Sequence, residues 1–257
     1  PIVLYEMPHG DTPLSAAMHW QDDVEVLSVC RGQVTLTLDG TQWILDAGDA
    51  VWINPGQIHG FDAVGEDARC EIFIFPVQHL LFAWEDHDQQ RFLRPLAEGK
   101  LGFPMRLPKN SAAWQWQNQI IFLQKERPAA YEMTTKALLI QLIGWLVQQE
   151  ALIPLQPDRH DDVCKQILLY IRQHYMEKIT VPMIAQAAAI APTYFSAFFA
   201  KHFCRSFSEY LCSYRIEQAC VMLRNTDRTV TEIGLATGFG SGSSFIQKFR
   251  KEKGTTP

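Results

Sequence analysis

Two histidines and one glutamate near the start of the chain have side chains that bind divalent ions or polar small molecules. His19 and Glu25 flank a run of strand-forming residues, and His59 follows the Pro55-Gly56 turn. A neutral imidazole offers a nitrogen lone pair and a carboxylate offers two oxygens, so the set suits a cation or a hydrogen-bonded ligand. Whether the three side chains meet depends on the fold of the segment that carries them.

Residues 24–75 have the pattern of short strands separated by turns. Residues 34–38 alternate with period two, Asp39-Gly40 is a strong hairpin signal, and Pro55-Gly56 marks another turn. Many short strands with Gly and Pro turns predict an all-β sandwich or barrel. In such a barrel we expect His19, Glu25 and His59 to line a ligand pocket, with Trp52 as a stacking wall.

After Pro108 the hydrophobic period changes from that of strands to that of helices. Residues 114–123 fit one amphipathic helix and residues 137–146 fit a second, whose apolar band is wider than one core face needs. A band of this width predicts either a dimer surface at residues 138–146 or two helices that simply cover the barrel. Both interpretations remain open at this point.

The strand region resembles the cupin barrels at two motifs. The matching residues are His19-x-Gln21, Glu25 and Gly32, then Gly48-Asp49, Pro55-Gly56 and His59. In metal-binding cupins, the resemblance implies, a His-x-His pair, a Glu and a later His hold a divalent ion. Gln21 replaces the second histidine here, and Gln is a poor ligand for a redox metal. We therefore expect no cofactor, and we keep a metal at His19, Glu25 and His59 as the alternative.

The composition is that of a globular chain with two unlike halves. The chain has 257 residues, 47% of them apolar and 20% charged, which excludes a wholly disordered chain, a collagen and a disulfide miniprotein. The net charge of −5 argues against a nucleic-acid partner. However, residues 1–157 carry 10 Lys and Arg against 19 Asp and Glu, a net −9, whereas residues 158–257 carry 13 against 9, a net +4. Only the second half suits DNA.

The chain length predicts the number of domains, and the cysteines and the lack of a long apolar run predict the cellular compartment. The length suggests two domains, and a proline-flanked linker at residues 154–157 predicts domains 1–157 and 158–257. The six cysteines include no Cys-x-x-Cys pair, which is typical of a reducing cytosol. No run approaches the roughly 18 apolar residues of a membrane helix, and no signal peptide is visible. We expect a cytoplasmic chain without a membrane partner.

The second half has a helical pattern in which one arrangement occurs twice. A short helix, a tight turn and a basic-ended helix precede Ser206-x-x-Glu209, a capping box, and the arrangement recurs from the capping box Thr229-x-x-Glu232. Pro192 begins the later helix of the first unit, and Ser241 caps that of the second. Each later helix is anchored by aromatic residues and has Lys on its outer side, which is the layout of a DNA recognition helix.

Residues 161–257 resemble the AraC-type transcription regulator domain, which has two helix-turn-helix units. The matching residues are Phe207, Tyr210, Leu211, Arg215, Ile216, Ala219, Leu223, Val230, Ile233, Gly238, Phe239, Phe245, Phe249, Lys251 and the closing Gly254-Thr-Thr-Pro257. A cupin-like sensor domain commonly precedes this module. The chain departs from the family at Ala191 (usually an N-capping Ser), at Ala197 (often polar) and at Cys204 (usually Gly). We expect softer sequence reading by the first unit.

The resemblance implies which side chains meet DNA. Those of the first recognition helix are Thr193, Ser196, Ala197 and Lys201, and those of the second are Ser243, Ser244, Gln247, Lys248 and Lys251. Gln247 is the best candidate for adenine. The alternative interpretation of these positions is an ordinary solvated helix face.

The expected fold class is two-domain α+β: a cupin-like β-barrel with two following helices, then an all-α domain with two helix-turn-helix units. The expected function is a ligand-responsive transcription regulator that binds a double-stranded DNA operator and a small-molecule effector. We expect no enzymatic activity and a homodimer, with RNA polymerase as a further partner if the regulator is an activator. The alternative is a metal-dependent cupin enzyme, an oxygenase or isomerase, with a helical appendage.

Overall fold

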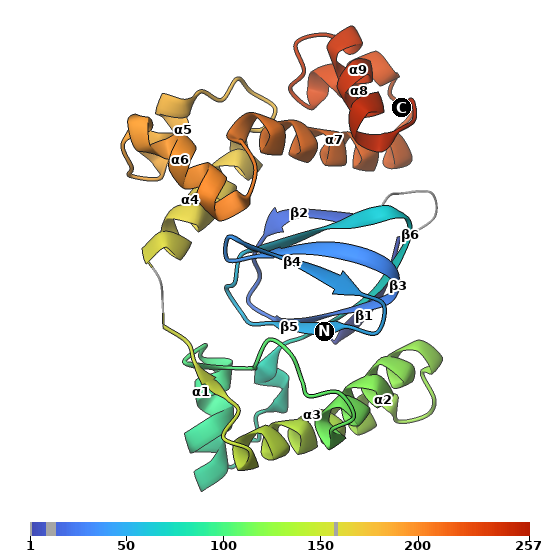
Figure 1. Ribbon diagram of the computed structural model, residues 1–257, viewed down its shortest axis with the longest axis vertical. Helices are drawn as coiled ribbons and strands as arrows, with labels where there is room; N and C mark the ends of the chain where they lie inside the picture. Colours follow the sequence, from blue (N-terminus) through green and yellow to red (C-terminus); the bar gives the residue numbers. More distant parts are fainter. Residues whose placement is uncertain (1, 9–13, 157–158) are drawn as a thin grey trace.

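The computed structural model describes residues 2–8, 14–156 and 159–257. Figure 1 shows three layers along the long axis: a curled sheet in the middle, helices α1 to α3 below it, and helices α4 to α9 above it. The sheet and the lower helices come from the first half of the chain, and the upper helices come from the second. The predicted order of a sheet-rich part, two helices and an all-helical part is confirmed.

The sheet is antiparallel and is built on two long, bent strands. Its strands are β1 (Val3–Met7), β2 (Ser15–His19), β3 (Val24–Leu38), β4 (Thr41–Asp46), β5 (Ala50–Ile53) and β6 (His59–Phe75). β3 and β6 pair along their length, with register shifts between Val29 and Gln33. β5 and β4 pair with successive halves of β3, and β1 and β2 pair with β6. We call this curled sheet, β1 to β6, the barrel.

The bend in β3 requires a glycine. Gly32 has a φ of +69°, and a Cβ at this position would lie 2.9 Å from the Cα of Ala68 on β6. A residue with a side chain would be strained there both by its backbone conformation and by this close approach. The bend in the middle of β3 therefore depends on Gly32.

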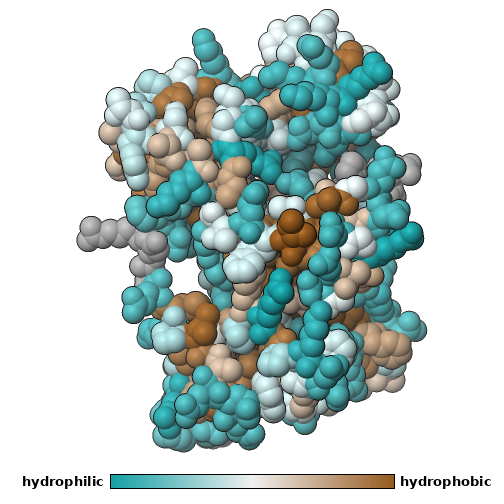
Figure 2. Space-filling model, in the orientation of Figure 1, coloured by the Kyte–Doolittle hydropathy of each residue, from teal (hydrophilic) through white to brown (hydrophobic). Residues whose placement is uncertain are grey.

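The two faces of the barrel sheet enter different cores. Leu27 and Val29 of β3 lie in the cluster inside the barrel, whereas Val26 and Trp52 face helices α2 (Ala112–Glu126) and α3 (Tyr131–Gln148). This is the alternation that a strand buried on both faces must show. Edge strand β4 keeps large apolar side chains exposed, at Trp43 and Ile44. Figure 2 shows apolar side chains gathered over the sheet in the middle of this face.

Helix α3 packs its apolar band inside its own domain. Leu138, Leu142, Ile143 and Leu146 are buried together with α2 and the outer face of the sheet. These buried members of the band cover the outer face of the barrel sheet, as one of the two interpretations of residues 138–146 has it. Ile140 and Trp145 on the same helix are only partly buried, so a dimer surface at residues 138–146 stays a prediction.

Short elements that lack a periodic pattern were not expected from the sequence. They are a 3₁₀ turn at Val77–Leu80, a π turn at Gln89–Leu93, α1 (Arg94–Ala97), β7 (Leu101–Gly102) and β8 (Ile153–Pro154). Buried Asn54 holds this region against the barrel: its amide group donates to the carbonyl of Phe103 at 2.9 Å and accepts from the Phe103 N–H at 2.7 Å. These contacts join residues far apart in the sequence, so no local sequence pattern predicts them.

The second half folds into six helices among the described residues, and four of them begin where Pro192, Ser206, Thr229 and Ser241 predict. They are α4 (Arg159–His174), α5 (Val181–Ala187), α6 (Pro192–Phe203), α7 (Phe207–Asn225), α8 (Val230–Ala236) and α9 (Gly242–Lys253). Both capping boxes are present, and the Ser241 side chain accepts from the Ser244 N–H. Ala191 makes no capping bond. Cys204 takes the left-handed conformation, with φ 53°, that the family's glycine would adopt.

Each helix-turn-helix unit has its own aromatic core. Phe195, Phe199 and Phe203 of α6 pack with α4, α5 and the start of α7. Phe245 and Phe249 of α9 pack with α8 and the second half of α7. Helix α7 therefore belongs to both cores and joins the two units. The predicted domain boundary at 157/158 lies outside the described residues and stays a prediction.

Among the described residues, no single helix is long and apolar enough to cross a membrane. Helices α5 and α6 meet the criteria of length and composition only as a pair, which is bent by 80°.

Candidate functional site

Helix α9 presents its polar side chains opposite its buried aromatic residues. With 3.6 residues per turn, Gln247 lies across the helix from Phe245 and Phe249. The predicted positions Ser243, Gln247, Lys248 and Lys251 are exposed, and Ser244 is half-buried beside its cap. This face can enter a groove without disturbing the core.

One residue of this face escaped the sequence analysis. Arg250 is exposed and lines the same surface as Ser243, Gln247 and Lys251. Its position three residues after Gln247 is the helical spacing that would have placed it on the face. A guanidinium there adds a donor for phosphate oxygens or guanine.

Helix α6 has a less polar outer face. Thr193, Ser196, Ala197 and Lys201 are all exposed, and Ala197 lies opposite Phe199. With a methyl group at its centre, this face can offer apolar contact to a thymine but no hydrogen bond there. The structure thus leaves the softer reading by the first unit as a prediction.

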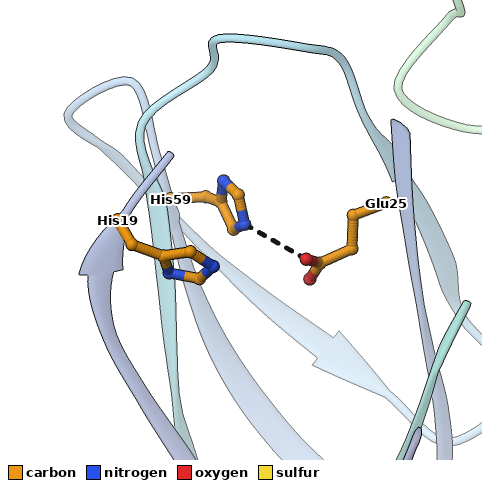
Figure 3. Close-up of side chains that lie close together, drawn as sticks. All are labelled: His19, Glu25 and His59. Atoms are coloured by element: carbon orange, nitrogen blue, oxygen red, sulfur yellow. Dashed lines mark hydrogen bonds and ion pairs between the residues drawn. The ribbon is translucent and has the colours of Figure 1, made fainter. Parts of the chain in front are cut away.

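Inside the mouth of the barrel, the two histidines and the glutamate do come together. Figure 3 shows His19 from β2, Glu25 from β3 and His59 from the start of β6 pointing toward one another. Their ligand atoms all lie within 4.8 Å of one another. Glu25 is 2% exposed and His59 is 0% exposed. Trp52 does not join them: it lies in the core beneath α2, where its indole Nε1 donates to Gln117 at 2.7 Å, so its assignment to the pocket is wrong.

Backbone carbonyls and Gln21 hold the side chains of this triad in place. The Nδ1 atoms of His19 and His59 each lie 2.9 Å from a backbone carbonyl oxygen, so each Nδ1–H can donate there and fix the orientation of its ring. Burial, and then the nearby His59, lower the pKa of His19, which keeps its imidazole neutral. Gln21 donates to Glu25 Oε2 at 3.2 Å, but the buried Oε1 has no hydrogen-bond partner among the described residues.

Two imidazoles and a carboxylate that converge, with one carboxylate oxygen unpartnered among the described residues, fit a divalent cation. His59 Nε2 lies within hydrogen-bond distance of Glu25 Oε2, at 3.4 Å. His19, Glu25 and His59 would hold such an ion through two imidazole nitrogens and a carboxylate oxygen, with backbone carbonyls orienting both rings. An ion there would supply Lewis acidity. The expectation that the chain needs no cofactor stays a prediction.

Comparison with known families identifies both parts of the chain. The AraC-like ligand binding domain family matches residues 9–143, more than half of the chain, and a helix-turn-helix domain family matches residues 184–257. The chain belongs to the AraC family. It is a transcription regulator with an AraC-like ligand-binding domain followed by a helix-turn-helix DNA-binding domain, as the sequence resemblance implied.

Relatives of this AraC-family protein share the same organisation over most of its length. The HTH-type transcriptional regulator YdeC of Bacillus subtilis (strain 168) is 25% identical over 254 residues, which cover 93% of this chain and 84% of YdeC. YobQ of the same organism is 24% identical over 88% of this chain and 81% of its own. Wild-type ToxT of Vibrio cholerae, solved with an unsaturated fatty acid, has the same fold, with a TM-score of 0.50 and 13% identity over 100% of this chain and 92% of its own.

The two domains of this AraC-family regulator are in direct contact. Tyr210 Oη of α7 donates to the carbonyl of Met18 at 2.9 Å, the Cys204 thiol donates to the carbonyl of Gly40 at 3.3 Å, and Arg205 pairs with Asp62 at 2.8 Å. Met18 and Ile58 of the barrel lie in the same apolar cluster as α4, α6 and α7. We call this contact surface the domain interface.

The end of α6, the predicted first recognition helix, touches the barrel. Gly40, in the turn from β3 to β4, has a φ of +75°, and a Cβ there would lie 3.0 Å from the carbonyl oxygen of Lys201. Lys201 and His202 belong to the last turn of α6. The placement of α6 is therefore tied to the strands that carry His19 and His59, since β3, β6 and β2 are paired neighbours.

A carboxyl group near the domain interface makes the stability depend on pH. Burial raises the pKa of Glu217 on α7 to about 7. The Glu217 carboxyl therefore keeps its proton to a higher pH in the folded chain than in the unfolded chain, where its pKa is near 4.3. The free energy of unfolding is highest below pH 4.3 and falls as the pH rises from there through 7. We predict that Glu217→Gln stabilises the protein more at pH 8 than at pH 4. The gain in the free energy of unfolding over wild type should be larger at pH 8 by roughly 1–3 kcal/mol.

Urea denaturation of wild type and variant at both pH values measures this difference. Glu126→Gln, at the exposed end of α2, is the control and should shift the unfolding free energy equally at both. A gain from Glu217→Gln that does not change with pH would rule out titration of this carboxyl as the cause.

Proposed function

We propose that this regulator reads an operator with α6 and α9 and that a small-molecule effector, bound at the barrel mouth near His19, Glu25 and His59, changes how these helices are presented. The observation that carries the proposal is the contact of the last turn of α6 with the Gly40 turn. A ligand that alters the barrel mouth acts on the position of α6 through this contact. The ligand must bind two domain arrangements with different affinity for this to regulate.

The DNA-contacting residues in this proposal are Thr193, Ser196, Ala197 and Lys201 on α6, and Ser243, Ser244, Gln247, Lys248 and Lys251 on α9, with Arg250 added. Their exposure on the faces opposite the aromatic cores supports this assignment. The two helices of one domain are expected to read major-groove segments about 34 Å apart, one helical turn of DNA.

The quaternary and cellular context is part of the same proposal. Residues 1–157 form the ligand-sensing and dimerisation domain, and residues 158–257 form the DNA-binding domain. A net charge of only +4 in the second predicts weak binding by one copy, so a homodimer supplies the useful affinity. The predicted dimer surface is the helix face at residues 138–146. The protein acts in the cytoplasm without catalysing a reaction, and it contacts RNA polymerase if it is an activator.

In-vitro selection of duplex DNA by the full-length chain tests the proposal. We expect enrichment of a motif with two conserved segments about one helical turn apart, and affinity that falls steeply with salt. Enrichment of no motif, together with no salt-dependent binding, would remove the operator from the account. The related regulators YdeC and YobQ support the expectation of DNA binding.

A further inference from the structure

The two helix-turn-helix units are joined by one helix and have separate cores. Among the described residues, no buried side chain belongs to both aromatic cores. Helix α7, which is about 28 Å long, contributes its first half to one core and its second half to the other. Two packed units that share little apolar contact area change their relative angle easily unless another contact opposes the change.

A groove of about 270 Å³ lies between the two units, beside α7. Ile179 and Phe207 line it from the first unit, and Phe239 and Ser244 line it from the second. We call this groove the seam. Side chains that leave a groove open between them make fewer van der Waals contacts than a closed core does, so apolar packing across the seam gives only weak resistance to a change of angle.

The guanidinium of Arg215 spans the seam. Arg215 lies near the middle of α7, and it donates from Nε to the carbonyl oxygen of Tyr175 at 2.7 Å and from Nη2 to that of Glu177 at 2.6 Å. Both acceptors follow the end of α4, in the first unit. Gly238, between α8 and α9 in the second unit, lies against the same guanidinium, since a Cβ there would lie 2.9 Å from Arg215 Cζ. Arg215 therefore contacts both units.

The form of this contact opposes rotation as well as separation. A guanidinium is planar and donates from two nitrogens at a fixed angle, so two hydrogen bonds to nearby carbonyls fix its direction and its distance. The ring of Tyr214 packs edge-on against that of Tyr175, with 5.4 Å between the centroids, and holds the same turn against α7. A lysine ammonium could reach one carbonyl but could not make the planar two-point contact.

We infer that Arg215 is a positioning residue that sets the distance and angle between α6 and α9, and thereby the spacing of the two DNA segments that they read. This inference rests on the proposed function, because it requires that both helices meet one operator. Each base pair added between the segments moves one of them by about 3.4 Å along the DNA axis and turns it by about 34°. Two units held by Arg215 fit one spacing, whereas two units without this contact follow the shift at little cost.

Fluorescence anisotropy titrations of the full-length chain test the inference on three duplexes: the selected duplex and two in which one base pair is added or removed between the segments. We expect wild type to bind both altered duplexes at least about tenfold more weakly than the selected one. In Arg215→Ala and in Arg215→Lys this ratio should fall below about threefold, because neither side chain makes the two-point contact. The ratio is taken within each variant, so a general loss of affinity cancels.

Arg224→Ala is the matched control, because Arg224 is an exposed arginine in the last turn of the same helix; this variant should keep the wild-type ratio. Salt dependence separates positioning from a direct phosphate contact. We expect the salt slope of Arg215→Ala to equal that of wild type, whereas loss of a phosphate contact would reduce it by about one. Circular dichroism confirms that each variant is folded, and Arg215→Lys decides the question if Arg215→Ala is not.

Three results would each overturn the inference: a wild-type ratio in a folded Arg215 variant, equal binding of all three duplexes by wild type, or a salt slope reduced by about one in Arg215→Ala. A residue that only stabilised the fold would lower affinity for the three duplexes together and leave the ratio unchanged. The proposed function is tested separately by the selection itself. A motif with two segments, together with a ratio that Arg215 does not affect, contradicts only the role of Arg215.

Discussion

Replacing Gln247 with alanine is expected to weaken binding to the selected duplex by roughly 10- to 100-fold, because a bidentate amide–adenine contact is worth about 1–3 kcal/mol. Gln247 lies at the centre of the exposed face of α9, opposite Phe245 and Phe249, so the substitution leaves the core intact. Fluorescence anisotropy titrations on the selected duplex and on a scrambled duplex measure the loss.

The scrambled duplex distinguishes base reading from backbone contact. A base-reading Gln247 affects only the selected duplex, whereas loss of a phosphate contact weakens both equally. Gln115→Ala, on the exposed side of α2, is the control and should bind like wild type. An unchanged affinity of Gln247→Ala for the selected duplex would take α9 out of the operator contact.

Gly238→Ala is expected to lower the free energy of unfolding by roughly 2–4 kcal/mol, the second large effect. Gly238 has a φ of +89°, and a Cβ there would lie 2.5 Å from the carbonyl oxygen of Tyr175. That carbonyl also accepts the 2.7 Å hydrogen bond from Arg215 Nε, which ties α7 to the end of α4. Alanine would therefore strain its own backbone and push apart the contact that joins the two helix-turn-helix units.

Urea denaturation followed by circular dichroism measures the loss. Gly240→Ala is a close control, because a Cβ at Gly240 meets no atom within 4 Å and its φ is outside the positive range. The control should change the unfolding free energy by less than about 0.5 kcal/mol. Equal stability of the two variants would show that the Tyr175 contact does not hold the units together.

The helical domain could be predicted closely because its signals are local. The capping boxes at Ser206 and Thr229 fix where α7 and α8 begin, and both are formed. Pro192 begins α6 at the position where a missing N–H costs nothing. Cys204 shows the limit of such signals: a non-glycine residue keeps the left-handed turn because the helices on either side of it are packed in one core.

The candidate sites needed the tertiary structure. Strand alternation alone cannot say which face is the inside, and Trp52 was placed with the triad although it faces α2. The triad itself was predictable, since His19, Glu25 and His59 sit at strand ends that pair with common neighbours. The domain interface was not, because Tyr210 and Met18 are 192 positions apart in the chain.

We propose that two helices of one chain, α6 and α9, read two DNA segments in one operator. The direct test is the affinity of the full-length chain for the selected duplex, compared with two versions in which one segment or the other is scrambled. Each scrambled version should bind roughly 10- to 1,000-fold more weakly, because each mismatched base pair costs about 1–3 kcal/mol of binding free energy. Full affinity after scrambling of either segment would contradict reading by both helices.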